Sequence, residues 1–224
     1  MDINNAFLHG DLDEEVYMRL PPSFTATSPN KVCKLRKSLY GLRQALRQWF
    51  VKLSSKLTEY GFVRSYADYS LFTYRKRKIS LALLVYLDDI ILAGNDSQAC
   101  KEFKEDLNSC FRMKDLGPLK YFLGIEVARG PLGLFLCQEK YALEIVNDCG
   151  FLGSKPVDFP VKENHKLPLA TGKLLDNPSL YRHLVRRLLY LTITRPELCN
   201  AVHTLSQFMQ APKEEHMHAA RRVL

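Results

Sequence analysis

Two adjacent aspartates, Asp88 and Asp89, stand between two runs of apolar residues. The runs are residues 81–87 and 90–93, so both carboxylates are expected beside a hydrophobic core. Neighbouring carboxylates in such a place are costly to ionise, because burial and mutual repulsion both disfavour the charged forms. A divalent cation removes both costs, since carboxylate oxygens are the ligands that Mg²⁺ prefers. The pair therefore indicates a metal site, with a water-facing hairpin turn as the alternative.

The segments around the aspartates have patterns typical of strands and helices. Residues 70–93 have strand-like composition with a basic turn at Arg75–Lys78, and two strands are expected to meet at the aspartates. Apolar residues three to four positions apart predict an amphipathic helix from Ser38 to Tyr60, which Gly61 ends. The pair is thus expected in a turn between two strands, with a helix earlier in the chain.

The rest of the chain predicts one hairpin, a proline-bearing stretch and several helices. The hairpin pairs 121–129 with 134–138. Prolines keep 153–178 irregular. Helices are expected at 97–113, 139–149, 180–194, 196–210 and 213–224. This order predicts an α+β domain followed by a helical one, with the boundary between Cys149 and Pro178.

Composition favours a globular protein with a polyanionic partner. The chain has 32 Lys and Arg residues against 24 Asp and Glu, and this excess favours phosphate-rich partners through counterion release. The six cysteines include no C-x-x-C pair, so they are interpreted as reduced core thiols. The six histidines are expected at the surface. No apolar run approaches the length of a membrane span, so the chain is expected to be soluble and intracellular.

The segment Tyr86-Leu87-Asp88-Asp89 resembles the Tyr-x-Asp-Asp motif of reverse transcriptases, which also lies between two hydrophobic strands. Further blocks agree in order along the chain, namely residues 1–12, 16–18, Pro21-Pro22 with Phe24, 37–45, 114–117, 123–127 and 190–196. Together these blocks resemble a copia-type LTR retrotransposon reverse transcriptase, a part of a retrovirus-related Pol polyprotein. Because they span nearly the whole chain, the wider sequence favours the metal site over the simple turn.

The resemblance implies an α+β polymerase palm, an antiparallel sheet with helices on one face, followed by a helical thumb or connection region. The palm with the start of the thumb is expected at residues 1–150, a linker or wrapping loop at 151–178, and the thumb or connection region at 179–224, leading toward an RNase H domain. The fingers region of the family precedes Asp2 and is expected to be largely missing. The isolated chain is therefore expected to be inactive.

The resemblance also implies RNA-directed DNA polymerase activity, in which dNTPs are transferred to a primer 3′-hydroxyl. Asp2 and Asp88 would bridge two Mg²⁺ ions, with Mn²⁺ as an alternative, and Asp89 would support the site. One ion would activate the hydroxyl and the other would hold the triphosphate.

Binding roles follow from the same resemblance. Nucleotide-binding residues would be Phe7, Tyr40, Gly41 and Tyr86, and primer-binding residues would be Phe122, Leu123 and Gly124. Phe7 would exclude a 2′-hydroxyl beneath the incoming sugar, with core packing as the alternative, and a plain hairpin is the alternative for the primer-binding residues. Lys114 and Lys120 are candidate proton donors to pyrophosphate, but no feature of the sequence distinguishes them from ordinary surface lysines.

The implied partners are an RNA or DNA template with its primer, dNTPs and the remaining Pol polyprotein with integrase and RNase H. No membrane partner is expected, and the compartment is a cytoplasmic virus-like particle or the nucleus. Two residues depart from the family pattern: Leu46 replaces a usual proline, and Arg186 replaces a usual glycine at an expected close-packed helical position. A non-catalytic nucleic-acid-binding remnant of a degenerate transposon is therefore the alternative function.

Overall fold

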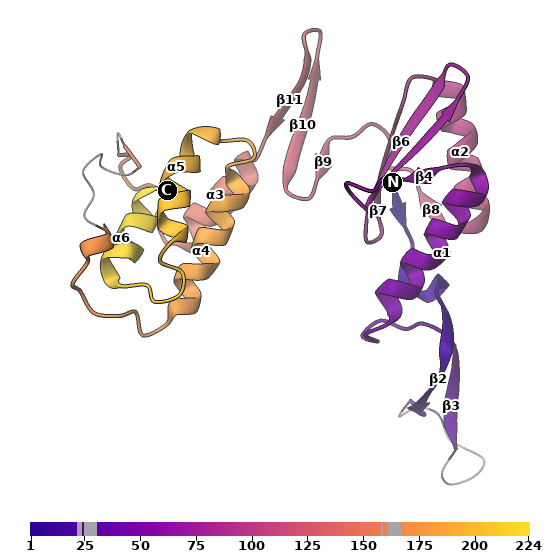
Figure 1. Cartoon of the computed structure of the whole chain (residues 1–224), viewed down its shortest axis with the longest axis horizontal. Coiled ribbons are helices and arrows are strands. Elements are labelled where there is room, and N and C mark those ends of the chain that lie inside the picture. The colour runs from indigo at the N-terminus through magenta and orange to yellow at the C-terminus, as the bar shows by residue number, and fades with distance from the viewer. Residues whose placement is uncertain (22–23, 25–30, 158, 161–166) are drawn as a thin grey trace. The chain divides into compact units, whose positions relative to one another are not determined.

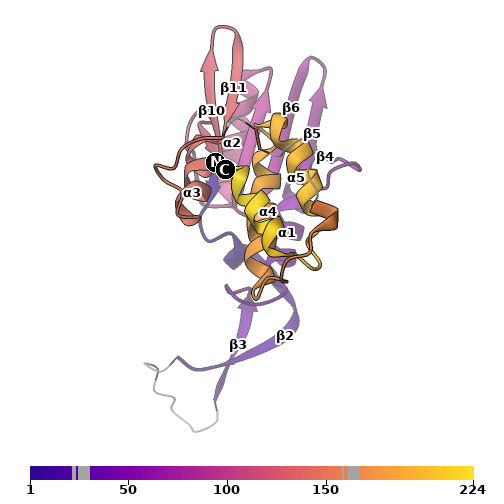
Figure 2. The ribbon, with the colours of Figure 1, turned by 90° about the vertical axis from the view of Figure 1, so that its left-hand side faces the viewer.

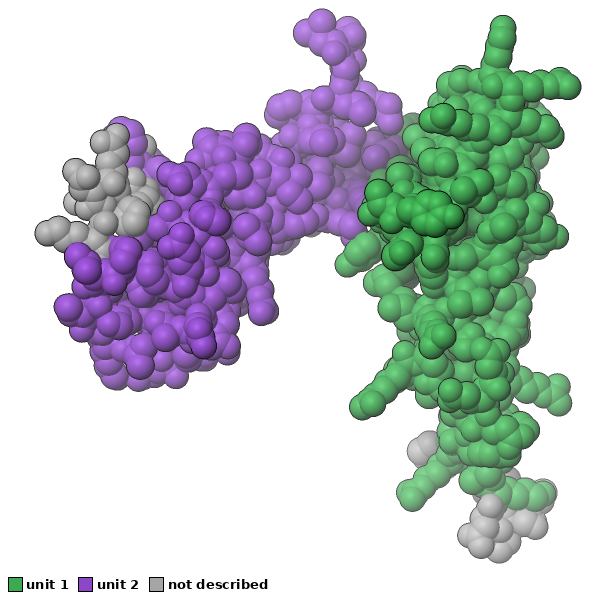
Figure 3. Space-filling model, viewed as in Figure 1, with its two compact units in different colours: residues 1–118 green, residues 119–224 purple. Residues whose placement is uncertain are grey.

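The computed structural model describes residues 1–21, 24, 31–157, 159–160 and 167–224. It has two compact units, residues 1–118 and 119–224, which Figure 3 shows in two colours. Each unit has its own hydrophobic cluster and is described by itself. Pro22 and part of the expected linker lie outside the described residues. The domain boundaries expected at residues 150 and 178 do not coincide with the boundary between the two compact units at residue 118. The expected domains stay a prediction.

Unit 1 contains an antiparallel six-stranded sheet with the order β4-β5-β6-β7-β1-β8 (Figure 1). The strands are β1 Asp2–Ile3, β4 Val63–Arg64, β5 Leu71–Lys76, β6 Ile79–Tyr86, β7 Asp89–Gly94 and β8 Met113–Lys114. Along β6, Leu81, Leu83 and Val85 are buried, while Ala82 and Leu84 between them are partly exposed. Because successive strand residues point to opposite faces, one face of the sheet is covered and the other is open.

Two helices, α1 Ala45–Tyr60 and α2 Ser97–Cys110, provide this cover. Trp49 and Leu53 of α1 and Phe103 and Leu107 of α2 join the buried residues of the strands in one cluster. The spacing of these residues places them on one stripe of each helix. The covered face is called the helix face below, and the other is called the open face.

The predicted helix from Ser38 begins later than expected, at Ala45. Gly41 has a φ of 90°, a left-handed conformation that interrupts a right-handed helix. The structure also contains a two-stranded ribbon that the sequence pattern did not predict, formed by β2 Asp11–Arg19 and β3 Val32–Lys37. No residue of either strand is buried, and the charged run Asp13–Glu15 interrupts the alternation of apolar residues in β2.

Unit 2 begins with a three-stranded sheet, β9 Tyr121–Phe122, β10 Ile125–Gly130 and β11 Gly133–Cys137. The helices are α3 Glu139–Asp148, α4 Pro178–Leu191, α5 Cys199–Ser206 and α6 Glu214–Arg222, with 3₁₀ turns η2 Leu167–Leu169 and η3 Pro196–Leu198. Figure 2 shows α4 and α5 in the bundle at the C-terminal end of the chain. At its core Tyr181 is fully buried and its hydroxyl donates to the Leu205 carbonyl at 2.7 Å.

Expectations about two single residues are wrong, and the expectation about the cysteines is confirmed in part. His216 is buried rather than at the surface: its Nδ1 accepts from the Lys213 amide at 3.0 Å, its Nε2 lies 3.0 Å from the Leu167 carbonyl, and its ring stacks on Phe208 at 4.0 Å. These contacts satisfy the first turn of α6, which explains the burial. Arg186 is exposed on α4, so no close-packed neighbour opposes it. All six cysteines are free, as expected, but none is fully buried: Cys100 and Cys149 pack against the two core clusters, while Cys110 and Cys199 are exposed.

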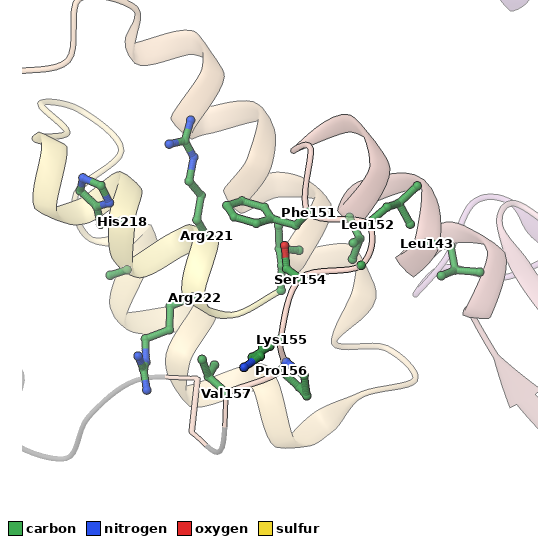
Figure 4. A pocket seen from close by; sticks show the side chains of 14 residues that line it. Leu143, Phe151, Leu152, Ser154, Lys155, Pro156, Val157, His218, Arg221 and Arg222 are labelled. Atoms are coloured by element: carbon green, nitrogen blue, oxygen red, sulfur yellow. The ribbon is translucent and has the colours of Figure 1, made fainter.

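A cavity of about 900 Å³ lies in unit 2, between the end of α3 and α6 (Figure 4). Its walls combine apolar side chains such as Phe151 and Leu152 with the cationic Lys155 and Arg221. None of the lining residues belongs to the predicted site. Among the described residues, no helix is long and apolar enough to cross a membrane.

The turn between β5 and β6 has an unfavourable residue. Lys76 pairs with Ile79, so Arg77 and Lys78 form the turn, and Arg77 has a φ of 55°. An L-residue loses roughly 1 kcal/mol in this left-handed region, whereas glycine does not. Arg77→Gly is therefore expected to raise the free energy of unfolding in urea by up to about 1 kcal/mol. Lys78→Gly, at a position without positive φ, is the control, and an equal gain there would contradict the explanation.

Candidate active site

The β6–β7 turn and the short strand β1 bring the three predicted catalytic aspartates together. Tyr86 pairs with Asp89 across the turn, and Asp2 of β1 is directly opposite Asp89 of β7. The Ile3 amide donates to the Asp88 carbonyl at 3.0 Å, so β1 also holds the turn itself. Residues that are nearly 90 positions apart in the sequence thus become neighbours through strand pairing.

Both paired aspartates belong to the open face of the sheet. Ile3 and Ile90 are each only 1% exposed and point to the helix face. Side chains alternate along a strand, so Asp2 and Asp89, the preceding residues, point the other way. On the far side of β1, Lys114 of β8 is the register partner of Asp2. A cation therefore flanks the carboxylates, while the other candidate proton donor, Lys120, belongs to unit 2.

The Trp49 side chain connects α1 to the β6–β7 turn through a hydrogen bond. It is 1% exposed, and its indole Nε1–H donates to the Leu87 carbonyl at 2.8 Å. The ring also packs edge-on against Phe111 at 5.1 Å. The sequence pattern placed Trp49 only on the apolar stripe of a helix. A general rule could have singled it out, because a buried indole N–H needs a hydrogen-bond acceptor. Trp49 is also the only tryptophan in the sequence.

The carboxylates influence one another electrostatically. The pKa of Asp89 is raised above its ordinary value, first by partial burial and then by the negative charges of Asp88 and Asp2. The positive N-terminal amine opposes this shift. The three side chains therefore share one local field in which adding a positive charge is favourable.

Among the residues that the structure describes, no group of three or more His, Cys, Asp or Glu side chains is arranged as a ready metal-ligand set. The donor chemistry nevertheless fits a hard divalent cation, because the site offers carboxylate oxygens whose mutual repulsion a cation relieves. The Asp2–Asp89 pairing also fixes the two backbones about 5 Å apart, which is within reach of shared ligation after side-chain rotation. Asp2, Asp88 and Asp89 are therefore the residues that could hold a metal.

The predicted nucleotide-binding residues fall into two contact groups. Phe7, in the 3₁₀ turn η1 Ala6–His9, packs edge-on against Tyr40, with ring centroids 5.1 Å apart. Tyr40 is exposed, and nothing lies within 4 Å of the position where Gly41 would carry a Cβ. Tyr86 is exposed and is the register partner of Asp89. Phe7 also contacts the core cluster, so packing and ligand contact are compatible roles for this ring.

The predicted primer-binding residues belong to unit 2. Phe122 ends β9, and Leu123 and Gly124, with φ values of 50° and 85°, form the turn into β10. The Tyr190 hydroxyl donates to the Leu123 carbonyl. A Cβ at Gly124 would lie 3.6–3.7 Å from the rings of Tyr190 and Tyr141. Two tyrosines from α3 and α4 thus hold this turn in position.

Comparisons with known proteins agree with the motifs. The sequence profile of the family described as "Reverse transcriptase (RNA-dependent DNA polymerase)" matches residues 1–163. The chain is 46% identical over 225 residues to the retrovirus-related Pol polyprotein from transposon RE1 of Arabidopsis thaliana, covering 100% of the chain and 15% of that relative. It is 44% identical to the corresponding polyprotein from transposon RE2 of Arabidopsis thaliana, again over 225 residues, with 100% and 16% covered.

A third relative is the retrovirus-related Pol polyprotein from transposon TNT 1-94 of Nicotiana tabacum, which is 36% identical over 237 residues, covering 100% of the chain and 18% of that relative. The chain therefore spans less than a fifth of the length of these relatives. No solved structure gives a significant match.

The raised pKa of Asp89 predicts a pH-dependent stability. Above the ordinary aspartate pKa of 3.8, the unfolded chain releases this proton before the folded chain does, so stability falls as pH rises through that window. Asp89→Asn is expected to lose this dependence and to be more stable than wild type at neutral pH in thermal melts. Asp11→Asn is the control of opposite sign, because hydrogen bonding to Lys52 lowers the pKa of Asp11 and its removal should cost stability at neutral pH.

The hydrogen bond from Trp49 predicts a local effect on the turn. Trp49→Phe is expected to cost roughly 1–2 kcal/mol of unfolding free energy, because it removes one hydrogen bond and leaves a small void. Amide exchange at Ile3, which donates to the turn, is expected to accelerate. Leu53→Val on the same helix is the control: it should lose comparable stability with no selective change at Ile3. Equal acceleration in both variants would refute the proposed link.

Proposed function

We propose that this chain, which belongs to the reverse transcriptase (RNA-dependent DNA polymerase) family, carries the nucleotidyl-transfer site of a copia-type retrotransposon polymerase. The observation that carries this proposal is the pairing of Asp2 with Asp89 beside the turn that contains Asp88. Asp2 and Asp89, from two distant segments, point to the open face of one sheet, and Asp88 lies in the adjoining turn. The relatives' names describe whole Pol polyproteins, and the proposal concerns the polymerase step alone.

In the proposed mechanism the aspartates supply ligands rather than proton transfer. Asp2 and Asp88 would hold two divalent cations, Mg²⁺ or Mn²⁺, and Asp89 would support them from the neighbouring strand β7. The ions, when bound, would lower the pKa of the primer 3′-hydroxyl and stabilise the departing pyrophosphate. The hydrogen bonds at Ile3 and Trp49 keep the backbone that carries these ligands fixed. Lys114, the register partner of Asp2, adds positive charge near a triphosphate.

The nucleotide would lie against the Phe7–Tyr40 pair. Phe7 is held by the core on one side and by the edge-on Tyr40 ring on the other, so it forms a firm wall beneath a sugar. A wall in this place disfavours a 2′-hydroxyl and favours dNTPs. Gly41 leaves open space for a base pair, and exposed Tyr86 adds a surface beside Asp89.

Unit 2 would act on the primer and template. The turn at Phe122–Gly124, fastened by Tyr141 and Tyr190, would hold the primer strand, and the helices that follow would form the thumb or connection region. This assignment retains residues 1–150 as palm with the start of the thumb, 151–178 as linker and 179–224 as thumb. The template, the primer and the other parts of the Pol polyprotein are the proposed partners.

Residues 1–224 taken alone are expected to be inactive in primer extension. The reason is that the fingers region expected before Asp2 would supply contacts to the triphosphate, and the tested residues 1–224 do not include it. A second candidate function is nucleic-acid binding without turnover. The lack of a ready metal-ligand set among the described residues favours this candidate.

Metal binding provides a test that does not depend on turnover. Because Trp49 is the only tryptophan and contacts the β6–β7 turn, Mn²⁺ bound at the aspartates should quench its fluorescence, and Mg²⁺ should compete. Asp88→Asn is expected to weaken the apparent Mn²⁺ affinity by about 10- to 100-fold. Asp13→Asn, at an exposed aspartate that contacts Gln48, is the control and should bind as wild type does. Equal quenching in all three proteins would refute the metal site.

Primer extension with dNTPs then separates the two candidate functions. Weak incorporation that disappears in Asp88→Asn, with Asp13→Asn unchanged, would support a polymerase site in residues 1–224. Salt-dependent binding of a primer-template with Mn²⁺ bound but no incorporation would support the non-catalytic function. Any incorporation that depends on Asp88, weak or robust, would overturn the expectation that residues 1–224 alone are inactive.

A further inference from the structure

Four consecutive cationic residues, Arg75–Lys78, occupy the end of the β5–β6 hairpin, here called the basic tip. All four are exposed. In the part of the chain that the structure describes, none of the four side chains forms an ion pair, although several other lysines and arginines do. The basic tip is therefore a concentrated positive charge that no acidic side chain neutralises within the described chain.

The basic tip lies at the opposite end of β6 from the catalytic turn. β6 runs from Ile79 to Tyr86, so the two ends are separated by roughly 24 Å at about 3.4 Å per residue. Arg75 points to the open face, because Phe72 and Tyr74 on the same strand pack into the core. Cationic and anionic groups thus mark the two ends of one sheet face.

Between these ends, the open face carries no charge on β5, β6 and β7. The residues that point outward there are Leu71 and Thr73 of β5, Ala82 and Leu84 of β6, and Ile91 and Ala93 of β7. An uncharged surface neither attracts nor repels a polyanion. A long anionic molecule could therefore pass along this face and meet its attractive contacts at the tip.

The backbone of the basic tip is firmly held. The Asn95 side-chain amide donates to the Lys78 carbonyl at 2.8 Å, and its oxygen accepts from the Ser80 amide at 2.8 Å. The Asn95 amide also donates to the Ser80 carbonyl at 3.2 Å. Arg77 has a φ of 55°, which favours glycine, so turn formation alone gives no reason for an arginine there. A fixed backbone presents the four cations with little loss of conformational freedom on binding.

We propose that the basic tip binds the phosphate backbone of a nucleic acid, as a contact separate from the aspartates. The proposal rests on the proposed function in one respect, since that function makes a nucleic acid the substrate. Closely spaced, unpaired cations match the regular phosphates of a nucleic acid, and binding gains from the release of counterions. The contact positions the nucleic acid without reading its sequence.

An acidic protein groove that binds an extended basic peptide fits less well. Arg75 and Lys76 are already paired with Ser80 and Ile79 in the hairpin, so an extended peptide conformation would require the two strands to separate. A phosphate backbone needs no such opening. The structure therefore favours the nucleic acid over an acidic peptide-binding groove.

The test compares a tip variant with a charge-matched control in the full chain. The tip variant combines Arg75→Gln with Arg77→Gly, a pair that removes two charges and gives the turn its preferred residue. The control combines Lys101→Gln with Lys140→Gln, two exposed positions on α2 and α3. Binding to a fluorescent DNA duplex is measured by anisotropy between about 50 and 200 mM salt, with EDTA present so that the aspartate site is not involved.

The tip variant is expected to bind roughly tenfold more weakly and to show a salt slope reduced by about 2, one unit for each lost phosphate contact. The control should change the binding affinity and the salt slope only by the amount expected from removing two positive charges far from the contact. Unchanged binding by the tip variant, or an equal loss in the control, would overturn the proposal. Loss of binding to poly-L-glutamate with retained duplex binding would also overturn it, in favour of an acidic protein partner.

Two further measurements separate this proposal from the proposed function. Asn95→Ala keeps all four charges but removes the bonds that hold the turn, and its salt slope should stay at the wild-type value while its affinity falls. Asp13→Asn, at an exposed aspartate outside the proposed site, should bind the duplex in EDTA with the wild-type slope. If Asp88→Asn and wild type show the same Mn²⁺ response, the metal site fails while tip-dependent binding still supports the contact described here.

Discussion

The register between β1 and β7 is the constraint on which the site depends. A strand has a side-chain period of two, so a slip of one residue would turn Asp2 toward the helices and Ile3 toward solvent. Ile3 and Ile90 are buried against α1 and α2, and exposing them would lose the burial that stabilises unit 1. The hydrophobic core therefore selects the register, and the register sets which carboxylates meet. Chemistry on the open face is positioned by packing on the helix face.

The same sheet explains how the site tolerates its charges. Partial burial, and then repulsion from Asp88 and Asp2, raise the pKa of Asp89. This cost is tolerated because backbone hydrogen bonds hold β1 against the β6–β7 turn. Trp49 provides one such attachment by joining α1 to the Leu87 carbonyl. At its other end, β6 leads to the basic tip, so one strand separates a group of anions from a group of cations by a fixed distance. A strand is suited to this because its length per residue varies little.

Unit 2 has a different physical basis. Its core is formed by helices, with buried Tyr181 bonded to the Leu205 carbonyl and His216 satisfying the start of α6. Its small sheet is held by tyrosines that contact the Leu123–Gly124 turn. Polar side chains thus satisfy backbone groups in both units, and two of these groups, the carbonyls of Leu87 and Leu123, belong to the turns that carry the proposed site residues. The separate cores are consistent with two units that each form a compact body.

Local sequence determined much of this protein. Alternating and three-to-four-residue apolar patterns identified the strands around Asp88 and most helices, because local periodicity reflects which face is buried. The ordered motifs identified the family. Tertiary structure alone decided which residues meet across long separations: Asp2 opposite Asp89, Trp49 bonded to the turn, and His216 beneath Phe208. A periodic pattern shows that a face is buried, but the partner that buries it is chosen by packing and hydrogen bonding between distant segments.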